Sequence, residues 1–74
     1  MSRNLPQRSR VERALSRIRL VDLAKRAGIG ASHASLVLSG KRNPSAKVLR
    51  SLSKALGVTS DDLLAYIERR RGAG

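Results

Sequence analysis

Aliphatic residues recur along this chain every three or four positions, which is the spacing of amphipathic helices. The first two stripes predict helices over residues 8–17 and 20–27. Both stripes follow the spacing i, i+3, i+4 and i+7, and they consist of Val11, Ala14, Leu15 and Ile18, and of Leu20, Leu23, Ala24 and Ala27. Gly28 follows the second stripe and favours a left-handed helix end there.

A third helix is predicted between Gly30 and Gly40, with an aliphatic inner face formed by Ala34, Val37 and Leu38. Ser45 is a favourable N-cap for a fourth helix, which Gly57 ends. This fourth helix has the strongest apolar stripe in the chain, made of Val48, Leu49, Leu52, Ala55 and Leu56.

Thr59 and Asp62 have the spacing of a capping box and predict the start of a fifth helix. No segment alternates with a period of two, and the chain has no internal repeat. The sequence therefore predicts an all-α fold with five helices in one domain at residues 8–71. A flexible basic arm is expected at residues 1–7 and a disordered tail at 72–74.

The composition allows little chemistry beyond binding. The chain has 74 residues, no cysteine, one histidine and one aromatic residue, so the core must be thin and aliphatic. A single histidine without cysteine does not make a metal site, and no spacing places a nucleophile beside a base or forms a Gly-rich phosphate loop. We therefore expect no cofactor, no metal and no enzymatic activity.

The net charge of +11 arises from 16 Lys and Arg against 5 Asp and Glu. A charge run alone is as typical of a solvated surface as of a binding surface. So many cations on a short chain, however, favour a polyanionic partner. No apolar run has the length of a signal peptide or a membrane span, so we expect no membrane partner and a cytoplasmic, nucleoid-associated location.

The span from about Arg13 to Leu64 resembles the Cro/repressor-type helix-turn-helix family, often called XRE. The matching residues, at fixed spacing without a gap, are Leu23-Ala24, Gly28, Gly30, Ala34, Val37, Gly40-Lys41-Arg42, Pro44-Ser45 and Ala55-Leu56-Gly57-Val58. The resemblance implies a compact five-helix domain of the lambda-repressor-like type, with the helix-turn-helix at about residues 20–39. It also implies that the third helix enters the major groove of double-stranded DNA, usually as a symmetric dimer.

The family's base-reading positions fall on small or apolar residues, namely Ala31, Ser32, Ser35 and Leu36, with His33 at the edge of the same face. None is an Arg, Asn or Gln, whose bidentate contacts are each worth about 1–3 kcal/mol of discrimination, so we expect thin direct readout. Leu36 is expected to contact thymine methyl groups. The alternative is an apolar side chain that a partner chain covers or that is merely exposed. A backbone or base contact of His33 and a partly buried or solvent-exposed imidazole without such a contact are equally expected.

The family's backbone-contacting positions fall on the start of the second helix and on the loop after the third, here Arg19, Ser39, Lys41, Arg42 and Asn43. Leu20 also matches such a position, but its side chain predicts a core residue. The family commonly has an acidic partner for Arg13 where Leu38 stands, so Arg13 is expected to be free for solvent or DNA. Arm contacts are predicted for Arg3, Arg8 and Arg10, with a solubilising tail as the alternative.

These features predict a small transcriptional regulator, such as a repressor, that binds an inverted repeat as a homodimer. The predicted dimer surface on the fifth helix is Leu64, Tyr66 and Ile67, with ordinary intramolecular packing as the alternative. Regulation is expected through protein concentration or a regulatory protein partner. Two other functions fit the sequence: a low-specificity architectural DNA-binding protein, and an antitoxin-like protein-interaction module.

Overall fold

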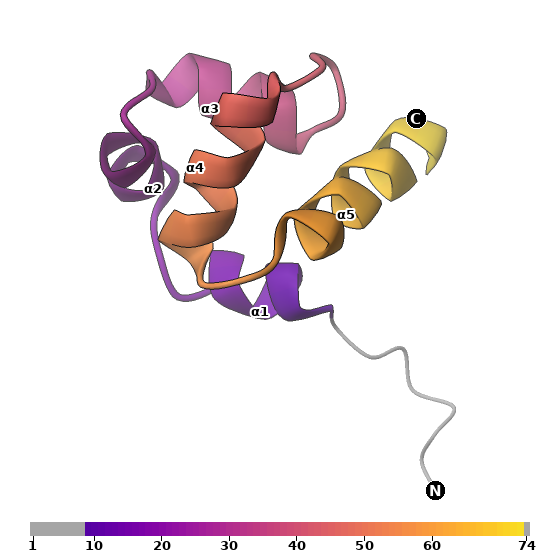
Figure 1. Cartoon of the computed structure of the whole chain (residues 1–74), viewed down its shortest axis with the longest axis horizontal. Coiled ribbons are helices and arrows are strands. Elements are labelled where there is room, and N and C mark those ends of the chain that lie inside the picture. The colour runs from indigo at the N-terminus through magenta and orange to yellow at the C-terminus, as the bar shows by residue number, and fades with distance from the viewer. Residues whose placement is uncertain (1–8, 74) are drawn as a thin grey trace, which may run out of the picture.

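The computed structural model describes residues 9–73, which form five α-helices and no strand. The helices are α1 (Arg10–Leu15), α2 (Leu20–Ala27), α3 (Ala31–Leu38), α4 (Ala46–Leu56) and α5 (Ser60–Ala73) (Figure 1). The predicted all-α class and the five helices are confirmed. None of these helices combines the length and the apolar character that a membrane crossing requires.

Hydrogen bonds from side chains begin three of the helices. Ser9 and Glu12 form a reciprocal capping box at α1, with N···O distances of 2.8 and 3.1 Å, which shortens this helix relative to the predicted start at residue 8. The Ser45 hydroxyl accepts the Val48 N–H at 3.1 Å, as predicted for α4. At α5, the Thr59 hydroxyl accepts the Asp62 N–H at 3.0 Å.

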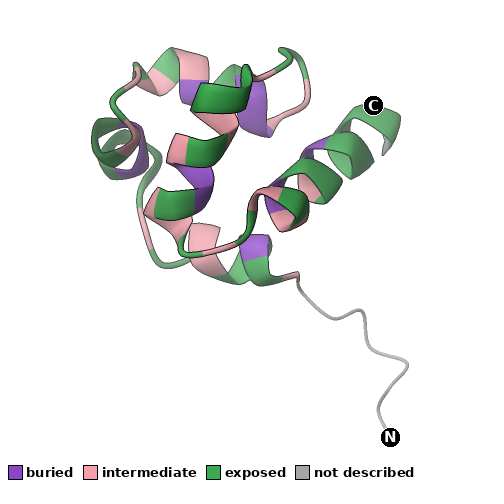
Figure 2. Ribbon diagram, viewed as in Figure 1, coloured by how far each residue is buried: buried purple, intermediate pink, exposed green. Residues whose placement is uncertain are grey.

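The centre of the molecule is α4, which packs against α1, α2 and α5, while α3 packs against α2 and α5 (Figure 1). The inner faces of the helices are buried and the outer faces are exposed (Figure 2). Every helix contributes to one aliphatic core, whose members are Val11, Leu23, Val37, Leu38, Leu52, Leu63 and Ile67. This core therefore fixes α2 and α3 through their inner faces.

Three expectations are wrong. Ile67 is fully buried, because it lies one turn after Leu63 on the face of α5 that completes the core, so it cannot belong to a dimer surface. Leu20 is 38% exposed rather than buried, because Leu23 and Ala24 occupy the inner face of α2. Residues 72 and 73 continue α5, where a disordered tail was expected.

Candidate nucleic-acid interface

The connection between α2 and α3 is a three-residue turn fixed by backbone hydrogen bonds. Gly28 has φ +76°, and the next amide, the Ile29 N–H, donates to the Ala24 carbonyl at 3.0 Å. Gly30 then adopts an extended conformation as the N-cap of α3. This arrangement is the helix end that the glycine spacing predicts, and it sets the angle at which α3 leaves α2.

The structure places the predicted base-reading residues on the outward side of α3. Ser32, Ser35 and Leu36 are exposed, and Ala31 and His33 are half-buried. The opposite side of the helix is buried in the core through Ala34, Val37 and Leu38. The outward side thus carries no Lys, Arg, Asp or Glu side chain.

Leu20 joins this outward side, which sequence reasoning missed. Together with Ala31, Ser32, Ser35 and Leu36, it lines a shallow groove of about 430 Å³. Leu20 and Leu36 are exposed to nearly the same extent, 38% and 39%. The groove is therefore an apolar and hydroxyl-lined surface between the start of α2 and the middle of α3.

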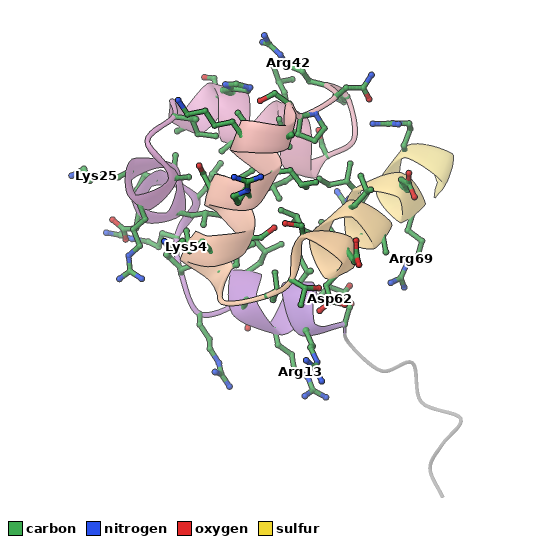
Figure 3. The ribbon with its side chains drawn as sticks, in the orientation of Figure 1. Arg13, Lys25, Arg42, Lys54, Asp62 and Arg69 are labelled. Atoms are coloured by element: carbon green, nitrogen blue, oxygen red, sulfur yellow. The ribbon has the colours of Figure 1, made fainter. Side chains whose placement is uncertain are left out.

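Cations lie in the loop that follows α3. The N–H groups of Lys41 and Arg42 both donate to the Leu36 carbonyl, at 3.0 and 3.2 Å, which folds the loop back onto the end of the helix. Both side chains are exposed, and Figure 3 shows Arg42 projecting from the molecule. Ser39 is half-buried, and its hydroxyl donates to the same Leu36 carbonyl at 3.1 Å.

Arg71, near the end of α5, braces this loop. Its Nε donates to the Gly40 carbonyl at 3.4 Å, and its Nη2 donates to the Asn43 side-chain oxygen. Asn43 is therefore oriented by α5 with its amide nitrogen left as a donor. Sequence reasoning missed Arg71, because the contact spans about thirty residues and the only signal was a terminal run of arginines.

Arg19 lies at the start of α2, beside Leu20. Its side chain is 85% exposed and its Nε lies 3.6 Å from a carboxylate oxygen of Asp22, an exposed ion pair that restrains it weakly. No side chain caps α2, so its first N–H groups have no capping side chain as acceptor next to this guanidinium. An anionic group at this position would meet both kinds of donor.

Of the three predicted arm residues, Arg10 lies in the described part of the chain. Arg3 and Arg8 lie outside the described residues. Arg10 is the first residue of α1 and lines a different cleft, between α1 and the end of α4. Arg13 lines the same cleft and is exposed there.

Two short helices joined by a glycine turn, with a solvent-facing second helix and a basic loop behind it, define a helix-turn-helix domain. The helix-turn-helix family model matches residues 8–63, so the chain belongs to the helix-turn-helix family of the Cro/repressor (XRE) type. This is a family of DNA-binding regulators. Searches of curated proteins and of solved structures returned no match.

Gly40→Ala is expected to destabilise the domain more than Gly57→Ala. Both glycines have positive φ, +82° and +75°, so either substitution costs about 1–2 kcal/mol of backbone strain. A methyl group at Gly40 would also lie 2.9 Å from the Arg71 backbone nitrogen, whereas the space at Gly57 is open. The collision should add about 1–3 kcal/mol.

Urea unfolding of the two variants measures this difference directly. Equal losses of unfolding free energy would show that the end of α5 does not press on the loop after α3.

Proposed function

We propose that this protein is a transcriptional regulator that inserts α3 into the major groove of its operator. The observation that carries the proposal is an outward side of α3 without charged side chains, with cations at both ends of the helix-turn-helix. Arg19 lies at the start of α2, and Lys41 and Arg42 follow α3. Small side chains permit a close approach to base edges, while the flanking guanidinium and ammonium groups bind phosphates. The Asn43 amide nitrogen supplies a weaker donor to the same backbone, and the Ser39 hydroxyl can do so once it releases the Leu36 carbonyl to which it donates.

The groove between α2 and α3 supports a particular kind of readout. Leu20 and Leu36 are the two large side chains on this surface, and neither donates nor accepts a hydrogen bond. In the major groove their natural contact is the C5-methyl group of thymine. Ser32 and Ser35 can form hydrogen bonds with several bases and so discriminate little between them. We therefore infer that thymines at fixed positions carry most of the sequence preference.

We further propose that the protein dimerises through the outer face of α5. Leu64 is 36% exposed there, while Leu63 and Ile67 point into the core. Tyr66 is half-buried, and the Arg70 guanidinium lies 5.9 Å from its ring centroid. Part of the Tyr66 side chain is therefore engaged in contacts within its own chain. Leu64 is therefore the residue on which the dimer contact depends.

An architectural DNA-binding protein is the second candidate. The absence of Arg, Asn and Gln among the five predicted base-facing residues favours it, because those side chains give the strongest base discrimination. The two functions differ in specificity, since regulators bind their sites about 10³-fold or more tighter than other DNA.

Arg42→Glu should weaken binding to any duplex by about tenfold and lower the slope of log K against log salt by about one, because one phosphate contact is lost. Lys54→Glu is the matched control, since it makes the same charge change on the side of α4 (Figure 3). Fluorescence anisotropy at several salt concentrations measures both. Equal effects of the two variants would place the duplex on another face.

Selection from a random duplex pool should enrich a thymine-containing inverted repeat bound about 10³-fold more tightly than scrambled DNA. Replacing a contacted thymine by uracil removes one methyl group, worth about 0.8 kcal/mol, and should weaken binding about fourfold. Leu36→Ala should bind thymine and uracil alike at the position that Leu36 contacts, while Leu20 keeps its own contact.

A pool that the protein binds without enrichment would establish the architectural function. An enriched site with equal thymine and uracil affinities in the unmodified protein would remove the leucine readout and leave the regulator function intact.

Leu64→Glu should convert a dimer into a monomer, because a carboxylate cannot be buried unpaired in an apolar contact. Ala65→Glu is the control, since Ala65 is the exposed neighbour on the same helix. Sedimentation equilibrium gives the mass of each species. If both variants sediment like the unmodified protein, α5 is not the dimer contact.

A further inference from the structure

A second cleft, of about 440 Å³, lies between α1, α2 and the end of α4. No residue of α3 or of the loop after it lines this cleft. In Figure 3, Arg13, which lines the cleft, and Arg42 of the loop lie on opposite sides of the molecule. The cleft is therefore separate from the surface that we assign to DNA.

Four exposed arginines surround the cleft: Arg10, Arg13, Arg17 and Arg26. The first three have the spacing i, i+3 and i+7, which brings them to one side of α1 and the turn after it. None of the described lining residues is acidic, and the single ion pair in the described part of the chain, between Arg19 and Asp22, lies elsewhere.

The carboxyl end of α4 also reaches this cleft at Gly57. A helix terminus contributes about half a negative charge, so it offsets only a small part of four guanidinium groups. The cleft therefore has a strongly positive potential and suits an anionic occupant.

The cleft also has an apolar floor. Half-buried aliphatic side chains from three places in the chain form it, among them Ile18, Leu56 and Val58. A guanidinium group both pairs with phosphate and stacks on planar groups. The occupant that satisfies both parts of the cleft carries negative charge at one end and an apolar, planar group at the other.

The dimensions separate the candidate occupants. The volume lies within the 300–1,000 Å³ range that is typical of small-molecule sites. A partner helix needs a far longer groove than α1 offers, since six residues of helix span about 9 Å.

We propose that this cleft binds a nucleotide, with the phosphates on the arginine rim and the base against the aliphatic floor. The proposal does not depend on the DNA-binding residues assigned above. It gives a function to the arginines of α1, which do not belong to the helix-turn-helix surface.

The test is calorimetric titration of the full chain at 0.15 M salt with each of the four ribonucleoside triphosphates and with tripolyphosphate. We expect at least one nucleotide to bind about tenfold more tightly than tripolyphosphate, because the base adds contacts with the floor. Amide chemical shifts of the unmodified protein should then change in α1 and around Gly57, and not in α3.

The double variant Arg13→Gln/Arg17→Gln should lose at least tenfold in nucleotide affinity. Lys25→Gln/Lys54→Gln removes the same charge outside the cleft and should lose less than twofold. Equal binding of nucleotides and tripolyphosphate, or equal losses in the two variants, would overturn the proposal in favour of non-specific charge attraction. A selective loss of duplex affinity in the arginine variant would instead make the cleft a second DNA surface.

Discussion

The aliphatic cluster around α4 is the contact on which every other feature depends. The two helices of the helix-turn-helix are eight residues each, too short to be stable in isolation. Burying Leu23 of α2 and Val37 of α3 in one core provides about 1.5–3 kcal/mol each and fixes the two helices relative to α4. Because this inner side is fixed, the outward side of α3 has a defined orientation without any contact of its own.

Helix positions could be predicted because apolar spacing and glycine positions are local signals. Gly28 and Gly57 both adopt the left-handed conformation and end their helices where the sequence indicated. The exposure of single residues was less accessible. Periodicity shows that Leu20 shares a helix side with Leu23, but the neighbouring helices decide how far along that side the core extends. For the same reason Ile67 belongs to the core although Leu64, three residues earlier, does not.

For the candidate site too, local sequence signals were readable, whereas contacts between distant parts of the chain were not. Sequence reasoning found the residues on α3 and in the loop after it, because the family's spacing carries them. It missed the brace from Arg71 to Asn43 and the groove that Leu20 and Leu36 line together, since both bring together residues from separate parts of the chain. The brace has a consequence for the loop: Gly40 must stay small because the backbone of α5 lies against it. Loop geometry and the length of α5 are thus coupled.

Charge and apolar contacts have separate roles in the proposed complex. A net charge of +11 attracts any duplex, and this attraction falls steeply as the salt concentration rises. Contacts of Leu20 and Leu36 with thymine methyl groups arise from the burial of apolar surface, which moderate salt hardly changes. Raising salt should therefore weaken specific and non-specific binding in parallel, while their ratio stays nearly constant. In this arrangement the arginines and lysines determine how tightly the protein binds, and two exposed leucines determine where.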